Sequence, residues 1–179
     1  PLTKKEGETV LILFKEFNKD YNANSLSKVI EMTSRGALKV VKNLKSQDVL
    51  ISKQLGRAVF YKVNLQDDYT VKILETLLMR EAREEASRWI FEFEEIYKDI
   101  EVALVFGSAV KDIKKANDID IMLVFKEQKL KRIKKFLEEK NKIAVRPIHL
   151  VMQTPSDFKS NLRKKDAVIM NALQRGYIL

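Results

Sequence analysis

Apolar side chains in the first 65 residues recur every three or four positions, which is the spacing of amphipathic helices. This spacing predicts three helices, with Ser25 as the cap of the second. Their apolar positions are Val10, Leu13, Phe14, Phe17 and Tyr21, then Leu26, Val29 and Ile30, then Ala37, Val40, Val41 and Leu44. Two β-prone runs, 49–53 and 58–63, follow and are joined by a turn at Leu55-Gly56.

A helical pattern without glycine or proline fills residues 67–98. The pattern predicts one long helix or two that link the halves of the chain, and its N-terminal part could pack against a second copy as a homodimer. Trp89 and Phe93 are expected to pack under a sheet. The apolar stripe is Val71, Leu74, Leu78, Ala82, Ala86, Trp89, Ile90, Phe93 and Ile96 or Tyr97.

The last 80 residues alternate between strand-like and helix-like patterns, which predicts a small mixed sheet with helices packed on it. Strands are expected at about 102–106, 118–125 and 143–152, and helices at about 128–140 and 165–174. The predicted fold class is therefore α+β. The predicted domains are a unit of three helices and a hairpin at 1–66, a helical linker at 67–99 and a sheet domain at 100–179.

The chain is basic, with a formal net charge of +9, and this favours an anionic partner such as nucleic acid or nucleotide. Its 45% hydrophobic residues suffice for a packed core. No apolar run is long enough to span a membrane, so no membrane partner is expected. Cysteine is absent, which excludes disulfides and thiolate metal sites and fits a cytoplasmic protein.

Candidate chemistry lies where the predicted 102–106 strand ends in Gly107-Ser108. Glycine allows a backbone to approach a ligand closely, and serine adds a hydroxyl donor. The next strand carries Asp118 and Asp120, which share one face because alternate strand residues do. Paired carboxylates repel each other unless a cation lies between them, and Mg²⁺ completes such a site with phosphate and water. The sequence therefore predicts a site for metal-bound nucleotide phosphate.

This order of Gly-Ser, loop and Asp-x-Asp resembles the nucleotidyltransferase superfamily that includes DNA polymerase β, and its minimal members most of all. The resemblance covers about Glu101 to Leu179. It implies that Asp118 and Asp120 are catalytic and bind Mg²⁺ or Mn²⁺. It also implies that Gly107, Ser108 and Lys111 bind a nucleoside triphosphate, with Lys114 and Lys115 as alternative cations.

The third carboxylate of that family is missing from the matching position of this chain. The segment Pro147-Ile148-His149-Leu150-Val151 has His149 where the resemblance expects an acidic residue. Imidazole is a poor Mg²⁺ ligand and suits softer metals better. Asp157 and Glu127 are weaker substitutes. This departure questions catalysis more than nucleotide binding.

The three helices and hairpin of residues 1–66 resemble a winged helix-turn-helix domain. In that family the third helix enters the major groove of duplex DNA and the wing contacts the flanking backbone. The resemblance implies that DNA-facing residues lie on the third helix and the wing, namely Arg35, Lys39, Lys42 and Asn43, then Lys53 and Arg57. A unit that contacts proteins instead is the alternative.

Two functions follow from these resemblances. The first is a DNA-binding protein whose nucleotidyltransferase domain moves a nucleotidyl group, such as AMP, to an acceptor, and a protein is one option for that acceptor. The second is a transcription regulator whose degenerate nucleotidyltransferase domain only binds nucleotide or a partner protein. The intact Gly-Ser and Asp-x-Asp favour the first, and His149 favours the second.

Overall fold

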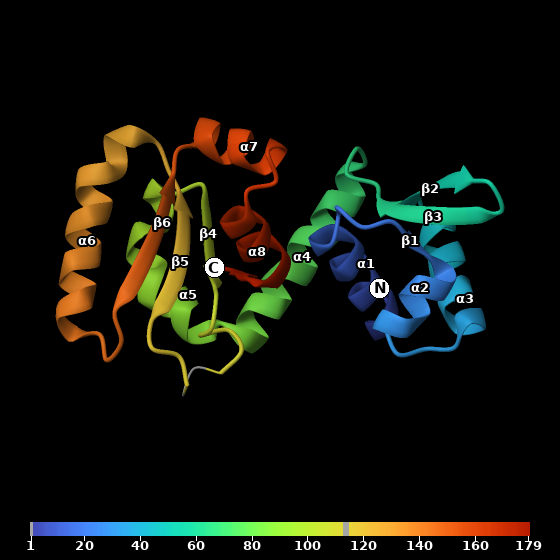
Figure 1. Ribbon diagram of the computed structural model, residues 1–179, viewed down its shortest axis with the longest axis horizontal. Helices are drawn as coiled ribbons and strands as arrows, with labels where there is room; N and C mark the ends of the chain where they lie inside the picture. Colours follow the sequence, from blue (N-terminus) through green and yellow to red (C-terminus); the bar gives the residue numbers. More distant parts are fainter. Residues whose placement is uncertain (1, 113–114) are drawn as a thin grey trace. The chain divides into compact units, whose positions relative to one another are not determined.

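The computed structural model describes residues 2–112 and 115–179. The chain divides into two compact units, Pro1–Leu78 and Met79–Leu179. Each unit combines helices with a small sheet, so the predicted α+β class is confirmed (Figure 1). The finer division at residues 66 and 99 stays a prediction. Within the described residues, no helix is long and apolar enough to cross a membrane.

The first unit begins with α1 (Lys4–Lys15), α2 (Ala23–Val29) and α3 (Ser34–Ser46), each started by a polar cap. Thr3 and Thr33 cap α1 and α3 through their hydroxyl groups. The expected cap of the second helix was wrong, because Asn22 caps α2. The side chain of Asn22 accepts a hydrogen bond from the backbone N–H of Ser25, and the hydroxyl of Ser25 accepts one from the backbone N–H of Asn22. This reciprocal pair is a capping box, which starts the helix three residues earlier than predicted.

A three-stranded sheet completes this unit, in the order β1-β3-β2. The predicted hairpin is present as β2 (Leu50–Leu55) and β3 (Ala58–Val63), and Gly56 adopts a φ of 60° in its turn. The short β1 (Tyr21–Asn22) pairs with β3. Tyr21 was predicted on the first helix, but α1 ends at Lys15. Three helices, a hairpin and this third strand form a winged helix-turn-helix fold.

The predicted helical linker is divided into three pieces. They are α4 (Asp68–Glu85), α5 (Ser87–Phe93) and the 3-10 helix η1 (Glu94–Asp99). Asp67 accepts hydrogen bonds from the backbone and hydroxyl of Thr70 and so starts α4. Ala86 leaves the helical region with a φ of −132°, and a second helix therefore begins after it.

The second unit is built on a four-stranded mixed sheet in the order β6-β5-β4-β7. Its strands are β4 (Val102–Phe106), β5 (Ile119–Val124), β6 (Ile148–Gln153) and β7 (Tyr177–Ile178). Only β5 and β6 are parallel, and α6 (Leu130–Ile143), preceded by the 3-10 helix η2 (Glu127–Lys129), connects them. The chain then forms α7 (Pro155–Arg163) and α8 (Ala167–Arg175) before β7.

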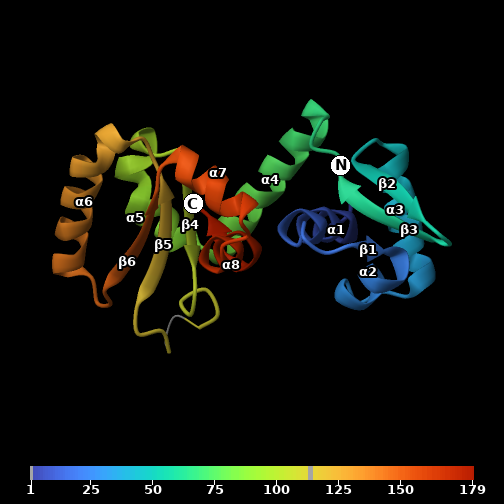
Figure 2. The ribbon, with the colours of Figure 1, turned by 45° about the horizontal axis from the view of Figure 1, so that its top comes forward.

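The two faces of this sheet differ in what covers them (Figure 2). One face packs against α5, η1 and α6, and the predicted place of Trp89 and Phe93 under the sheet is confirmed. Phe93 and Phe136 meet edge to face there, with ring centroids 5.6 Å apart. The other face packs Leu104, Phe106 and Met122 against α8. Side chains of β5 alternate, so Asp120 shares this second face with Met122.

Candidate nucleotide and metal site

Three potential ligand side chains meet at the start of β5 and β6. Asp118 immediately precedes β5, Asp120 lies within it, and His149 is the second residue of β6. Because the two strands are parallel and in register, Asp120 pairs directly with His149. Ligand atoms of Asp118, Asp120 and His149 all lie within 4.8 Å of one another. A single ion of two positive charges can contact all three at such a spacing.

The Gly-Ser turn is pressed against one of these carboxylates. Gly107 follows β4 with a φ of 78°, and β4 pairs with β5 so that Phe106 lies opposite Asp120. A Cβ atom added to Gly107 would collide with Oδ2 of Asp120 and lie 3.0 Å from its Cγ. Glycine is therefore required here for two reasons, the positive φ and the close approach to Asp120. Ser108 is exposed, and its carbonyl accepts the amides of Lys111 and Asp112.

The charges of the three side chains are unbalanced without a cation. Partial burial raises the pKa of Asp120, the carboxylate of Asp118 raises it further, and His149 lowers it. Nδ1 of His149 lies 3.2 Å from Oδ2 of Asp118. Since the ionised form of Asp120 is disfavoured, a bound cation would gain interaction energy with it. Binding of a cation near Asp120, or of a proton to it, would therefore relieve the cost of keeping this carboxylate ionised.

A second candidate surface lies on α3 of the first unit. Arg35, Lys39 and Lys42 are exposed along one side of the helix and line a shallow groove. The exposed Lys53 lies on β2, and the exposed Arg57 lies in the turn of the hairpin. These positions combine an exposed basic helix with an exposed basic wing.

Asn43 and Leu38 add detail that the sequence pattern did not supply. The amide of Asn43 donates a hydrogen bond to Glu6 of α1, although the residue is exposed. Burial alone would raise the pKa of Glu6, but the hydrogen bonds from Thr3 and Asn43 together lower it below its usual value. Leu38 is 37% exposed between the basic side chains, and its place off the apolar stripe was the available signal.

Comparison with known proteins identifies the second unit. Residues 90–176 match the family model described as "Polymerase beta, Nucleotidyltransferase". These residues form a nucleotidyltransferase domain. Together with the element order of residues 2–66, this match confirms the predicted winged-helix unit joined to a domain of the polymerase β superfamily. A search of curated proteins found no significant match.

Solved structures similar to the chain are bacterial regulators. The homodimeric winged helix-turn-helix DNA-binding domain of a Mycobacterium bovis protein is 10% identical, with a TM-score of 0.38, over 45% of this chain and 70% of that chain. MepR of Staphylococcus aureus, which regulates a multidrug efflux pump, is 12% identical, with a TM-score of 0.39, over 78% and 77%. A MepR–DNA complex from the same organism is 13% identical, with a TM-score of 0.40, over 54% of this chain and 79% of that chain.

Lys111 and Lys115, two of the lysines predicted near the nucleotide, have other polar neighbours in the structure. Lys111 lines a cavity with Glu85, Arg88, Asp112 and Tyr177, next to β4 residue Val105, whose side chain packs on the α5 and α6 side of the sheet. Lys115 forms an ion pair with Asp112 at 3.4 Å. Lys114 lies outside the described residues. Lys111 as a triphosphate contact therefore stays a prediction.

The two substitute carboxylates lie at the other end of the sheet. Glu127 follows β5 and Asp157 follows β6, whereas the aspartate pair and His149 lie at the beginning of these strands. Asp157 instead accepts a hydrogen bond from Thr154 at 2.7 Å and helps to start α7. Four residues of strand, or about 13 Å, separate Asp120 from the end of β5. Neither carboxylate can reach an ion held by Asp120.

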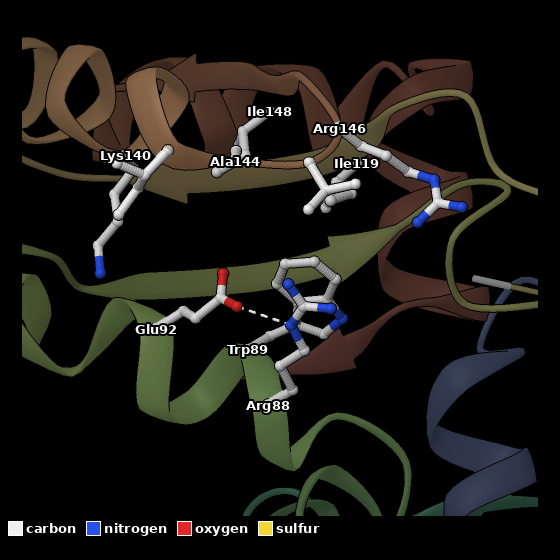
Figure 3. A pocket seen from close by; sticks show the side chains of 10 residues that line it. Arg88, Trp89, Glu92, Ile119, Lys140, Ala144, Arg146 and Ile148 are labelled. Atoms are coloured by element: carbon white, nitrogen blue, oxygen red, sulfur yellow. Dashed lines mark hydrogen bonds and ion pairs between the residues drawn. The ribbon is translucent and has the colours of Figure 1, made fainter. Parts of the chain in front are cut away.

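A small cavity of about 180 Å³ opens on the opposite face of the sheet (Figure 3). Trp89 of α5 faces Ile119 and Ile148 across it. Arg88 forms an ion pair with Glu92 at 2.7 Å and lies 5.0 Å from the Trp89 ring. Because Ile119 and Asp120 point to opposite faces, this cavity is separate from the aspartate site.

Proposed function

We propose that the nucleotidyltransferase domain binds a nucleoside triphosphate with a divalent cation and transfers its nucleotidyl group to an acceptor. The observation that supports this most directly is the Gly107 turn, packed on Asp120 beside Asp118 and His149. An exposed backbone turn next to paired carboxylates offers amide donors for phosphate and oxygen ligands for its cation. Mg²⁺ and Mn²⁺ are the cations that the resemblance to nucleotidyltransferases implies for this site.

In the proposed reaction, the oxygen of an acceptor hydroxyl forms a bond to the α-phosphorus as the bond to pyrophosphate breaks, pyrophosphate leaves, and the hydroxyl proton passes to solvent water. A divalent cation at such a site stabilises the charge on the transferring and leaving oxygens. Asp118 and Asp120 would hold such a cation and, through it, the phosphates. Gly107 keeps the turn close enough for its backbone and Ser108 to contact phosphate oxygens. A protein hydroxyl is one candidate acceptor.

Calorimetry on the full chain tests the nucleotide site. Binding of ATP should be tighter with Mg²⁺ or Mn²⁺ than with EDTA, and Asp118→Asn and Asp120→Asn should each reduce that metal dependence at least tenfold, or about 1.4 kcal/mol. Glu127→Gln removes a carboxylate at the other end of β5 and is the matched control. Metal-independent binding, or a control as weak as the aspartate variants, would reject the site.

We also propose that α3 and the hairpin turn bind duplex DNA. The exposed side chains of Arg35, Lys39 and Lys42 share one helix face, and Leu38 beside them offers an apolar contact for a thymine methyl group. Fluorescence anisotropy with labelled duplex should show affinity that falls steeply with salt. Arg35→Ala should weaken binding by about 1–3 kcal/mol, and Lys39→Ala should lower the salt slope by about 1.

Lys72→Ala on α4 is the charge-matched control for those DNA measurements. If it weakens binding as much as the α3 variants do, the interaction is non-specific charge attraction. If the wild-type chain does not bind duplex DNA at low salt, the DNA proposal fails and the unit contacts protein instead. The second candidate function is a transcription regulator whose nucleotidyltransferase domain only binds nucleotide or a partner protein. His149 in place of a third carboxylate favours that second function.

A homodimer through residues 67–98 stays a proposal. Tyr69, Met79 and Phe91 of this segment are 62%, 59% and 78% exposed, and a second copy would cover such apolar surface. Light scattering across a concentration series measures the mass directly. A mass that stays at 20.8 kDa at every concentration would reject the dimer.

A further inference from the structure

The nitrogen ligand is what distinguishes this site from an all-oxygen one. His149 lies directly beside Asp120 in the parallel ladder, and its Nδ1 is 3.2 Å from Oδ2 of Asp118. Two neighbouring ligands bound at about 2.1 Å to one ion lie about 3.0 Å apart in an octahedral site and about 3.4 Å apart in a tetrahedral one. The observed separation falls between these values. The nitrogen and oxygen are therefore already spaced as ligands of one ion.

A purely structural role explains this cluster poorly. The side chains of His149 and Asp118 are 60% and 33% exposed, and an exposed ion pair contributes little stability. Asp120 adds a second carboxylate, and its ligand oxygen lies within 4.8 Å of the ligand atoms of both Asp118 and His149. Gly107 accepts a positive φ so that its turn can lie against Asp120. These features gather three donor side chains at a place where their contacts contribute little to the stability of the fold, so a bound ion explains the cluster better.

The donor set is a poor match to Mg²⁺ alone. Mg²⁺ prefers oxygen ligands, whereas imidazole suits Fe²⁺, Co²⁺, Ni²⁺ and Zn²⁺. Glu127 and Asp157, the other carboxylates considered for the third position, lie at the opposite end of β5 and β6. The imidazole of His149 is therefore the donor available beside Asp120 on β6.

We propose that Asp118, Asp120 and His149 form a single site that selects a late first-row transition-metal dication, such as Co²⁺ or Zn²⁺, over Mg²⁺. This inference rests on the cation site of the proposed function and specifies its metal. The two aspartates supply affinity for any dication, and His149 supplies the selectivity. Three protein donors leave coordination positions for water and phosphate, as catalytic metal sites do.

The test is a metal titration of the full chain without nucleotide. Visible absorption follows Co²⁺ directly, and competition against Co²⁺ gives the affinities of Zn²⁺ and Mg²⁺. The wild-type chain should bind Zn²⁺ and Co²⁺ more than about 100-fold more tightly than Mg²⁺. The substitution His149→Ala should weaken the affinities for Zn²⁺ and Co²⁺ at least about tenfold. Mg²⁺ affinity should change less than about threefold, because imidazole is a poor ligand for it.

Two further variants make the result specific to the nitrogen. His149→Asp should restore dication binding but move selectivity toward Mg²⁺, because it replaces nitrogen with oxygen at the same ladder position. Glu127→Gln, at the other end of the sheet, should behave as the wild type. Equal Co²⁺ and Zn²⁺ affinities in wild type and His149→Ala would overturn the proposal. Because His149 is an exposed side chain, these substitutions should leave the fold intact, which circular dichroism checks.

Nucleotide binding is measured separately, so the two proposals can fail independently. If ATP binds with Mg²⁺ and neither affinity nor metal preference depends on His149, the transition-metal inference falls and the nucleotide site stands. If Co²⁺ binds through His149 and no nucleotide binds, the metal inference stands and the nucleotidyl-transfer proposal falls.

Discussion

Gly107→Ala offers a sharp test because Gly56 supplies an internal control. Both glycines have a positive φ, 78° at Gly107 and 60° at Gly56. A Cβ atom on Gly56 meets nothing within 4 Å, whereas one on Gly107 collides with the Asp120 carboxylate. The two substitutions therefore share the backbone cost and differ in the steric one.

The magnitudes follow from these two contributions. A non-glycine residue in the left-handed region costs about 1–2 kcal/mol, which is the whole expected loss for Gly56→Ala. Gly107→Ala must also displace the side chain of Asp120 from its rotamer, which adds about 0.5–1.5 kcal/mol. We expect a total loss of about 1.5–3.5 kcal/mol in the free energy of unfolding of the second unit.

The two units can be followed separately during urea unfolding. The chain has one tryptophan, Trp89, and it lies in the second unit, so its fluorescence reports on the nucleotidyltransferase domain. Gly107→Ala should shift the fluorescence transition, and Gly56→Ala should shift only the circular dichroism signal of the first unit. Displaced Asp120 should also weaken metal binding at least about tenfold. Gly107→Ala that binds metal as the wild type does would refute the reasoning.

Two further predictions concern buried or half-buried carboxyl groups. Because the pKa of Asp120 is raised, its contribution to stability falls as pH rises through that pKa. Asp120→Asn should therefore stabilise the metal-free protein at pH 7. Urea titrations at several pH values should show that this gain in the free energy of unfolding shrinks on acidification. Asp99 has the opposite sign: the hydrogen bond from Lys129, with Arg132 nearby, lowers its pKa, so its stabilising effect is lost as pH falls through that value. Asp99→Asn should flatten the acid limb of the stability profile, and an unchanged limb would contradict this.

The fold was predictable wherever one pattern was long and unambiguous. The three helices of the winged-helix unit and the strands at 102–106 and 118–125 were predicted from periodicity and are present. Phe17 and Tyr21 continued the spacing of the first helix and misled the prediction, because α1 ends at Lys15. Tyr21 lies instead in β1 and pairs with Tyr61 of β3. That strand is a tertiary contact between distant segments, which local spacing does not encode.

The site was predictable in its composition but not in its contacts. Spacing alone placed Asp118 and Asp120 on one face, and the ladder put His149 beside Asp120 as expected. The contact of Gly107 with Asp120 depends on the pairing of β4 with β5. The bond from Asn43 to Glu6 joins residues 37 positions apart, and a helical wheel of α3 could not reveal it. Such pairings come from the assembled fold.

The electrostatic cost at Asp120 links stability to ligand binding. Its raised pKa means that ionised Asp120 lowers the free energy of unfolding of the metal-free domain. Burial is the main cause, and the charge of Asp118 adds to it. A cation that binds only the folded state stabilises it by about 2.7 kcal/mol at 100 times its Kd. Metal should thus raise the urea midpoint followed by Trp89 fluorescence. The winged-helix unit should unfold at the same urea concentration with or without metal, because the three ligands Asp118, Asp120 and His149 all belong to the second unit.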